Sequence, residues 1–218
     1  MALDLYLDTA DVSEWDRLIP TGLFKGITTN PLLAHRAGLS YGDINWVDLA
    51  QHAADLGAKE LHGQVYGNPN TYADWARRLL EAGQSAGIKT VVKVPLVEPA
   101  IREVPKLISL GCPILMTACY DAKQMFVATA LGAEFIAPYF GRMLEADLPA
   151  YEMLGQMVMI GQGSRTRVLV ASLRSAEQMS RLAERGCDCF TISPDVARDL
   201  LEDERTLAAY SDFENVAN

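Results

Sequence analysis

The sequence predicts one α/β domain over residues 1–218, folded as a single-domain (β/α)8 barrel, or TIM barrel. Two observations predict it. Eight short, nearly continuous apolar stretches recur along the 218 residues, and a helix candidate follows each of them. Such an alternation indicates a parallel sheet covered by helices. Eight units favour closure of that sheet into a barrel over an open sheet.

The eight strand candidates follow one another along the chain. They cover residues 4–8, 26–30, 60–65, 90–94, 113–117, 134–139, 167–172 and 189–193. A glycine stands shortly before five of them, at Gly57, Gly87, Gly111, Gly132 and Gly186. Glycine favours the left-handed conformation just past the end of a helix, so each of these positions predicts a helix end before a strand.

Helix starts support the same organisation. Residues that can cap a helix precede several helix candidates, at Asn70, Asp121, Ser175 with Gln178, and Ser193 before Pro194. One helix candidate, residues 98–111, contains Pro105 in its interior. We expect a kink or an interruption there, because proline lacks the N–H and clashes with the preceding turn.

Composition narrows the classes of function. The formal net charge of -9 argues against nucleic acid or an acidic membrane surface as a partner, since both require clustered Lys and Arg. The four cysteines form no C-x-x-C pair, which excludes a zinc ribbon or thioredoxin motif and fits a reducing cytoplasm. No signal peptide follows Met1, and no apolar stretch reaches about 18 residues. We therefore expect a cytoplasmic protein without a membrane span.

Polar residues gather near the C-terminal ends of the predicted strands, where the active site of such a barrel lies. A packed interior would use Val, Ile or Leu at these positions. Seven strands instead carry Asp8, Thr28, Asn30, Gln64, Lys93, Thr117, Tyr139 and Ser172, with His62 one layer deeper as a core histidine. Any one of them could belong to a solvated rim, but the set predicts a functional site.

Lys93 interrupts an apolar strand, whereas the other five lysines lie near helices or turns. Burying an ammonium group is costly unless the group is paired or neutral. Desolvation lowers the pKa of a lysine and so supplies the free amine that a nucleophile needs. The alternative is a structural lysine paired with a buried carboxylate such as Asp8.

A second group of polar residues follows the sixth and seventh strands. Arg142, Ser172 and Arg174 offer two guanidinium groups and a hydroxyl, which predicts a phosphate site. The alternative is a pair of surface arginines. The three histidines lack metal-ligand spacing, and the P-loop, dinucleotide and nucleophile-elbow motifs do not occur in the sequence.

With these residues the chain resembles the small transaldolase family, and most of all its fructose-6-phosphate aldolase branch. The matching segments run from the first strand to the last, at residues 5–12, 26–31, 91–95, 116–124, 132–142, 168–174 and 191–197. Two positions bear on the branch. Transaldolases proper place Glu and Phe where this chain has Gln64 and Tyr139, and both residues match the aldolase branch.

The resemblance implies that Lys93 forms a Schiff base with a sugar-phosphate ketone and that no metal or organic cofactor takes part. It implies that the reacting carbons are surrounded by Asp8, Thr28, Asn30, Gln64, Thr117 and Tyr139. It implies that the phosphate is held by Arg142, Ser172 and Arg174. It further implies a homo-oligomer, often a decamer, in which the C-terminal helix packs on a neighbour. The chain departs from the family pattern at residues 96–100, at residues 143–150 and in a shorter C-terminal tail.

We therefore expect a class I aldolase that cleaves or forms fructose 6-phosphate from dihydroxyacetone and glyceraldehyde 3-phosphate. Its expected catalytic residues are Lys93, Asp8, Tyr139, Gln64 and Thr117. The alternative in the same class is a transaldolase, which passes the dihydroxyacetone unit between sugar phosphates. Two alternatives from other classes are a non-catalytic sugar-phosphate-binding barrel, which needs no buried amine, and an isomerase barrel, which needs a glutamate base that no strand end offers.

Overall fold

Eight parallel strands pair in chain order, and the last strand pairs with the first to close a barrel. The structure is a computed structural model that describes residues 3–217, so residues 1, 2 and 218 of the predicted domain lie outside the described residues. The strands are β1 (Asp4–Asp8), β2 (Gly26–Thr28), β3 (Glu60–Gln64), β4 (Lys89–Pro95), β5 (Ile114–Cys119), β6 (Phe135–Pro138), β7 (Arg167–Val170) and β8 (Cys189–Ile192). The predicted (β/α)8 fold is confirmed.

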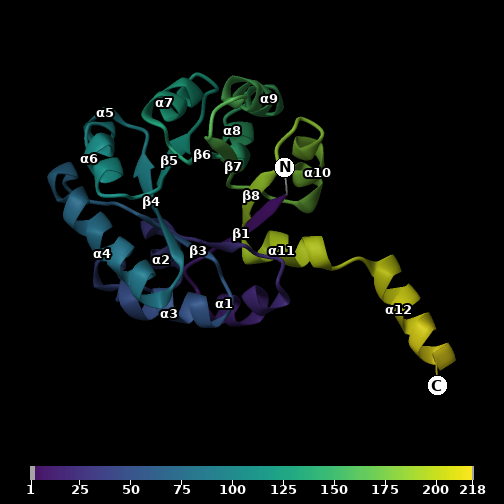
Figure 1. The fold of residues 1–218 in the computed structure, drawn as a ribbon. Coiled ribbons are helices and arrows are strands. Elements are labelled where there is room, and N and C mark those ends of the chain that lie inside the picture. The colour runs from purple at the N-terminus through teal and green to yellow at the C-terminus, as the bar shows by residue number, and fades with distance from the viewer. Residues whose placement is uncertain (1–2, 218) are drawn as a thin grey trace.

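Helices connect successive strands and surround the barrel (Figure 1). They are α1 (Val12–Leu18), α2 (Pro31–Arg36), α3 (Trp46–Asp55), α4 (Tyr72–Ala86), α5 (Glu98–Ile101), α6 (Val104–Ser109), α7 (Gln124–Leu131), α8 (Phe140–Glu145), α9 (Ala150–Gly161), α10 (Ala176–Ala183), α11 (Pro194–Leu201) and α12 (Glu204–Ala217), with 3-10 turns η1 (Ile19–Thr21), η2 (Tyr41–Asp43) and η3 (Pro69–Thr71). The C-terminal helix α12 extends away from the barrel, and none of its described residues is buried (Figure 1). Within residues 3–217, no helix is long and apolar enough to cross a membrane.

The glycines that predict helix ends behave as expected. All five adopt the left-handed conformation, with φ between 68° and 97°. The predicted interruption at Pro105 is also confirmed, because α5 ends at Ile101 and α6 begins at Val104 with the proline in its first turn. A missing N–H breaks no helical hydrogen bond at that position.

The predicted helix start at Asn70 is wrong. Asn68 instead caps the short turn η3, where its side chain accepts a hydrogen bond from the N–H of Asn70 at 3.0 Å. The main helix α4 then begins at Tyr72 without a side-chain cap. The Asn68–Pro69 pair favours a turn of its own before the helix, which is why the apparent cap lies inside that turn.

The predicted start at Asp121 is wrong for a similar reason. Its side chain accepts a hydrogen bond from the N–H of Lys123 at 3.0 Å, which forms a turn, and α7 begins only at Gln124. The two other predicted caps are confirmed, since the side chains of Ser175 and Ser193 each accept a hydrogen bond from the third residue that follows.

Charged side chains gather at the end of the barrel opposite to the strand C-termini. The carboxylate of Glu60 lies at their centre and accepts a hydrogen bond from the hydroxyl of Tyr6 at 3.0 Å. The ring of His62, which is fully buried as expected of a core histidine, lies 3.0 Å from the same carboxylate. Lys25 and Lys89 complete the group at 3.2 and 3.5 Å. A buried carboxylate with this many partners stabilises the barrel only while it is ionised.

The ionisation of Glu60 makes the stability of the barrel depend on pH. Burial opposes ionisation of Glu60, but the hydrogen bond from His62 and the charges of Lys89 and Lys25 outweigh it and lower the pKa of Glu60 from 4.5 to about 2. The stabilisation is therefore complete above pH 4.5 and is lost as the pH falls towards 2. We expect Glu60→Gln to reduce the free energy of unfolding at pH 7 by about 1–3 kcal/mol. Thermal unfolding at several pH values, followed by circular dichroism, measures this.

The control is Glu98→Gln, because the side chain of Glu98 on α5 is 76% exposed. It should leave both the stability and its slope with pH unchanged. A Glu60→Gln variant whose stability falls with acid as steeply as that of the wild type would contradict the assignment.

Candidate active site

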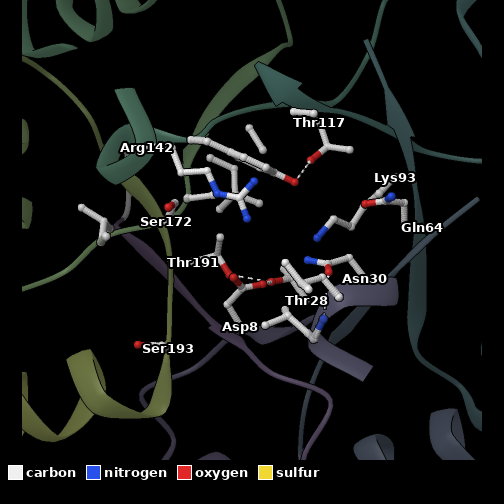
Figure 2. Close-up of a pocket in the computed structure, with 18 of the residues that line it drawn as sticks. Asp8, Thr28, Asn30, Gln64, Lys93, Thr117, Arg142, Ser172, Thr191 and Ser193 are labelled. Carbon is white, nitrogen blue, oxygen red and sulfur yellow. Dashed lines mark hydrogen bonds between the residues drawn. The ribbon is translucent and has the colours of Figure 1, made fainter. Parts of the chain in front are cut away.

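A cavity of about 650 Å³ opens at the C-terminal ends of the strands. Every residue predicted to act on the substrate lines it: Asp8, Thr28, Asn30, Gln64, Lys93, Thr117, Tyr139, Arg142, Ser172 and Arg174. Figure 2 shows several of these side chains projecting from different strands towards one space. The barrel brings them together because all its parallel strands end at the same rim.

The amine of Lys93 points into this cavity, although the residue is only 4% exposed (Figure 2). Burial lowers the pKa of Lys93, and the negative charge of Asp8 partly opposes that shift. Among residues 3–217, no side chain forms a hydrogen bond or an ion pair with this amine. The ion pair with Asp8 that a structural lysine would require is therefore not formed.

A hydroxyl group holds the carboxylate of Asp8 instead. Thr28 on β2 donates to Asp8 on β1 at 2.6 Å, and the Thr28 hydroxyl lies 2.6 Å from that of Thr191 on β8 (Figure 2). Both threonines are buried. Asp8 is thus fixed at the cavity wall without neutralising the amine of Lys93.

The oxygen and the nitrogen of the Asn30 side-chain amide have separate roles. Its oxygen accepts a hydrogen bond from the N–H of Leu33 at 3.0 Å and so caps α2. Its amide nitrogen then faces the cavity on the side of Lys93 (Figure 2). An amide nitrogen can only donate, so Asn30 can bind an oxygen of a ligand without leaving its cap.

A pair of hydroxyl groups lies on another side of the cavity. Thr117 on β5 and Tyr139 just after β6 are 3.0 Å apart. Burial raises the pKa of Tyr139, although the hydrogen bond with Thr117 opposes the shift. The phenol therefore keeps its proton at neutral pH. Gln64 lies beside Lys93 in the strand register, and the Tyr41 hydroxyl holds its backbone by accepting from the N–H at 2.7 Å and donating to the carbonyl at 2.9 Å.

The cavity also has a cationic corner, formed by Arg142, Ser172 and Arg174. The backbone N–H of Gly141 donates to the carbonyl of Ser172 at 3.0 Å. A side chain at Gly141 would come within 2.1 Å of that oxygen, so only glycine permits this approach. Ser172 adopts a left-handed conformation with φ of 63°, which is strained for a residue other than glycine. This backbone geometry places both arginines at one cavity edge.

The two guanidinium groups differ in their partners. Arg142 donates weakly to the Tyr120 hydroxyl at 3.5 Å and lies 5.0 Å from the centre of the Tyr139 ring. It has no carboxylate partner among the described residues. Arg174 is paired with Glu145 at 2.8 Å and 3.2 Å, so one of the two predicted phosphate ligands already binds a carboxylate.

Sequence reasoning missed some polar residues that line the cavity, namely Arg36, Glu145, Thr191 and Ser193. The alternation that points to the other strand ends would also have found Thr191, had it been applied to the last strand. Arg36 and Glu145 lie at the ends of helices α2 and α8, where no strand pattern could indicate them.

A buried amine, a carboxylate and a cationic corner at the mouth of a (β/α)8 barrel define an enzyme of the Schiff-base aldolase or transaldolase class. The family model described as Transaldolase/Fructose-6-phosphate aldolase matches residues 5–218. The chain therefore belongs to the transaldolase/fructose-6-phosphate aldolase family. This confirms the predicted resemblance and leaves the binding-barrel and isomerase alternatives without support.

Curated relatives agree with this assignment. A protein of Anaeromyxobacter sp. (strain K) named "Probable transaldolase" is 30% identical over 215 residues, which cover 97% of this chain and 94% of the relative. Another, from Rhodospirillum centenum (strain ATCC 51521 / SW), is 30% identical over 216 residues, covering 97% and 89%. The matches span the whole barrel rather than one motif.

Solved structures with a similar fold include mandelate oxidases. One bound to 2-hydroxy-phenylacetamide superposes with a TM-score of 0.62 at 17% identity, over 87% of this chain and 64% of the oxidase. Another, with an FMN monooxide adduct, gives a TM-score of 0.60 at 18% identity, over 89% and 64%. The chain thus spans less than two thirds of these oxidases, and the likeness concerns the barrel fold alone.

The buried amine of Lys93 costs the folded protein stability. Lys93→Met should stabilise the protein by about 1 kcal/mol at pH 7, because it replaces a buried, unbonded amine with an apolar side chain of similar length. Burial places the pKa of Lys93 in the folded state below its unfolded value of 10.5, so the unfolded chain binds more protons. Wild-type stability therefore rises with pH in this range, and the advantage of the variant should shrink as the pH approaches 10.5. Chemical denaturation at pH 7 and 10 measures it.

The control is Lys123→Met, whose side chain is 78% exposed in the wild type and which should change stability little. A clear loss of stability in Lys93→Met would indicate that Lys93 is a structural partner of Asp8 after all.

Proposed function

We propose that the protein is a class I aldolase that cleaves and forms fructose 6-phosphate, with Lys93 as the Schiff-base residue. The observation that carries the proposal is the buried, unbonded amine of Lys93, whose lowered pKa favours the nucleophilic form. Membership of the transaldolase/fructose-6-phosphate aldolase family supports the same chemistry.

The reaction begins at the C2 ketone of the sugar phosphate. The amine of Lys93 adds to C2, and loss of water leaves an iminium ion. Asp8 accepts the proton of the C4 hydroxyl as the C3–C4 bond breaks. The electrons of that bond form an enamine and neutralise the iminium, while C4 becomes the aldehyde of glyceraldehyde 3-phosphate. Protonation of the enamine and hydrolysis then release dihydroxyacetone and the free amine.

The remaining cavity residues orient the substrate and the water. In this proposal the Asn30 amide nitrogen donates to one hydroxyl group of the three-carbon unit. The Thr28 hydroxyl, whose proton is bonded to Asp8, accepts a hydrogen bond from another. In this proposal Tyr139, Thr117 and Gln64 hold a water molecule for carbinolamine chemistry and reprotonation, which their shared place in the cavity lining supports. The phenol of Tyr139, which keeps its proton at neutral pH, is the group that can transfer a proton to the enamine. The amide of Gln64 can only form hydrogen bonds, because it does not titrate.

The cationic corner suits the phosphate of the substrate. Arg142 offers a guanidinium group without a carboxylate partner among the described residues. Arg174 already donates to Glu145, so a phosphate can bind only its remaining N–H groups or must displace Glu145. A phosphate therefore meets one free positive charge and one that is already paired. Sugar phosphates fit this corner better than uncharged sugars.

Transaldolase activity is the second candidate, and the curated relatives named "Probable transaldolase" favour it. In that reaction the enamine attacks a second aldose phosphate instead of taking a proton. The Tyr139 hydroxyl argues for protonation, because it brings a proton donor into the cavity that Lys93 also lines. The two activities share every step up to the enamine.

We also propose a homo-oligomer in which α12 packs on a neighbouring copy. This helix exposes Leu207, Tyr210 and Phe213 at spacings of three residues, and these side chains are 60%, 60% and 67% exposed. Such a stripe on an isolated helix is unfavourable in water and suits a protein partner. The family resemblance, which implies a ring such as a decamer, supports this proposal.

The different partners of Arg142 and Arg174 predict different effects of their substitution on KM for a phosphorylated substrate. Arg142→Ala should raise KM for fructose 6-phosphate by roughly tenfold to a hundredfold. Arg174→Ala should have a smaller effect, because Glu145 already occupies that guanidinium group. Addition of dihydroxyacetone to unphosphorylated glyceraldehyde should change little in both. Arg77→Ala, an exposed arginine on α4, is the control. Equal losses with phosphorylated and plain aldehydes would show that the arginines support structure only.

The choice between aldolase and transaldolase is tested by Tyr139→Phe, which removes one hydroxyl at nearly constant volume. Cleavage of fructose 6-phosphate to free dihydroxyacetone should fall by about 10²–10⁴-fold, as for loss of a general acid. Transfer to erythrose 4-phosphate should persist or rise. Both rates are measured by coupled assays with and without the acceptor. A wild type that transfers rapidly but releases no dihydroxyacetone would replace the aldolase proposal with transaldolase.

Assembly is tested by light scattering on the full chain and on the double variant Leu207→Ser, Phe213→Ser. The wild type should form a defined oligomer, and the variant should dissociate, because the changes remove the apolar stripe of α12. A wild type that remains a monomer at assay concentrations would rule out this interface.

A further inference from the structure

We propose that Thr191 is a positioning residue that holds the carboxylate of Asp8 in place through Thr28. The inference rests on the proposed role of Asp8 as the proton acceptor. Neither the resemblance to the family nor the pattern of the first seven strands assigns a role to Thr191. Its side chain lines the active-site cavity from the eighth strand, which closes the barrel beside Asp8.

The three residues lie on three consecutive strands of the barrel. Asp8 on β1 stands between Thr28 on β2, its partner in the strand register, and Thr191 on β8. The Thr28 hydroxyl is 2.6 Å from the Asp8 carboxylate and 2.6 Å from the Thr191 hydroxyl (Figure 2). Thr28 is fully buried and Thr191 is 3% exposed, so water competes little for either bond.

The direction of both hydrogen bonds follows from the number of protons. The Thr28 hydroxyl donates to the Asp8 carboxylate, so the proton between them belongs to Thr28. A hydroxyl has a single proton, so Thr28 must accept in its contact with Thr191. The proton of Thr191 therefore points to Thr28, and that of Thr28 points to Asp8. Removing the Thr191 hydroxyl leaves the middle member of this chain free to reorient towards other acceptors.

Asp8 depends on this chain because it has few other partners. Among the described residues, the hydroxyl of Thr28 is its only side-chain hydrogen bond. The carboxylate does not pair with Lys93 either, so the Thr28 hydroxyl alone sets the orientation of the proton acceptor at the C4 hydroxyl. A small rotation of a catalytic base away from its proton has a large effect on rate.

The buried hydroxyl of Thr191 has no other use in the fold. Below the cavity, the barrel interior is apolar and includes Cys189 on the same strand and Ala171 just after β7. Thr28 is its only hydrogen-bond partner within residues 3–217. Valine would fill the same volume without a buried polar group, so packing alone does not require threonine here.

The test compares Thr191→Val, which removes the hydroxyl, with Thr191→Ser, which keeps it. For Thr191→Val we expect kcat for fructose 6-phosphate cleavage to fall by about tenfold to a hundredfold, with a smaller change in KM. Thr191→Ser should restore kcat to within roughly threefold of the wild type. Thr191→Ala, which also lacks the hydroxyl, replaces the valine variant if circular dichroism shows that the latter is unfolded.

The matched control is Thr90→Val on β4. Thr90 is a buried strand threonine like Thr191, but its side chain contacts the helix α4 side of the barrel, close to Gly83. It should leave kcat unchanged. Borohydride reduction with dihydroxyacetone should label Thr191→Val as fully as the wild type, because formation of the Schiff base with this ketone involves no C4 proton.

A double-mutant cycle separates a positioning role from a local packing effect. Because Thr191 acts through Thr28, adding Thr191→Val to Thr28→Val should lower kcat by less than about twofold beyond Thr28→Val alone. Suppose that borohydride labels the wild type. If the effects of the two substitutions on kcat are then fully additive, or if Thr191→Val leaves kcat unchanged, the inference about Thr191 is wrong while the proposed function stands. A wild type that is not labelled by borohydride would overturn the proposed function and the inference with it.

Discussion

The burial of one amine without a carboxylate partner is the constraint on which the active site depends. Lys93 lies on β4 of a closed barrel, and the residue is only 4% exposed although it lines the cavity. Desolvation lowers the pKa of Lys93, which favours the uncharged amine that the proposed Schiff-base chemistry needs. This works only if the nearby carboxylate of Asp8 is held elsewhere, and the Thr28 hydroxyl holds it. The lowered pKa of Lys93 and the fixed carboxylate of Asp8 are two results of the same arrangement.

Buried charged groups have partners at one end of the barrel and lack them at the other. At the N-terminal end of the strands, Glu60 is buried together with the cations and hydrogen-bond donors that keep it ionised. At the C-terminal end, Lys93 is buried without such partners among the described residues, and Ser172 in the cationic corner has a strained left-handed conformation. Satisfied charges at one end contribute stability, whereas unsatisfied groups at the other end cost stability and provide chemistry.

Much of this arrangement could be predicted from the sequence, because strand alternation and the barrel rim are simple geometric rules. They suffice to place residues as distant in sequence as Asp8 and Arg174 around one cavity. The pairing of Arg174 with Glu145 could not be predicted, since it joins the loop after β7 to the end of α8, and the strand pattern does not determine how these two segments lie. The helix starts failed at Asn70 and Asp121 because a capped turn and a capped helix use the same residue types.

The central claim is that Lys93 forms the covalent intermediate, and borohydride trapping with peptide mapping tests it most directly. The protein is incubated with dihydroxyacetone and borohydride, digested and analysed by mass spectrometry. Reduction of the iminium should leave a stable adduct on the peptide that contains Lys93, in proportion to the loss of activity. An adduct on another lysine would contradict the account. So would full inactivation by dihydroxyacetone and borohydride without an adduct on Lys93.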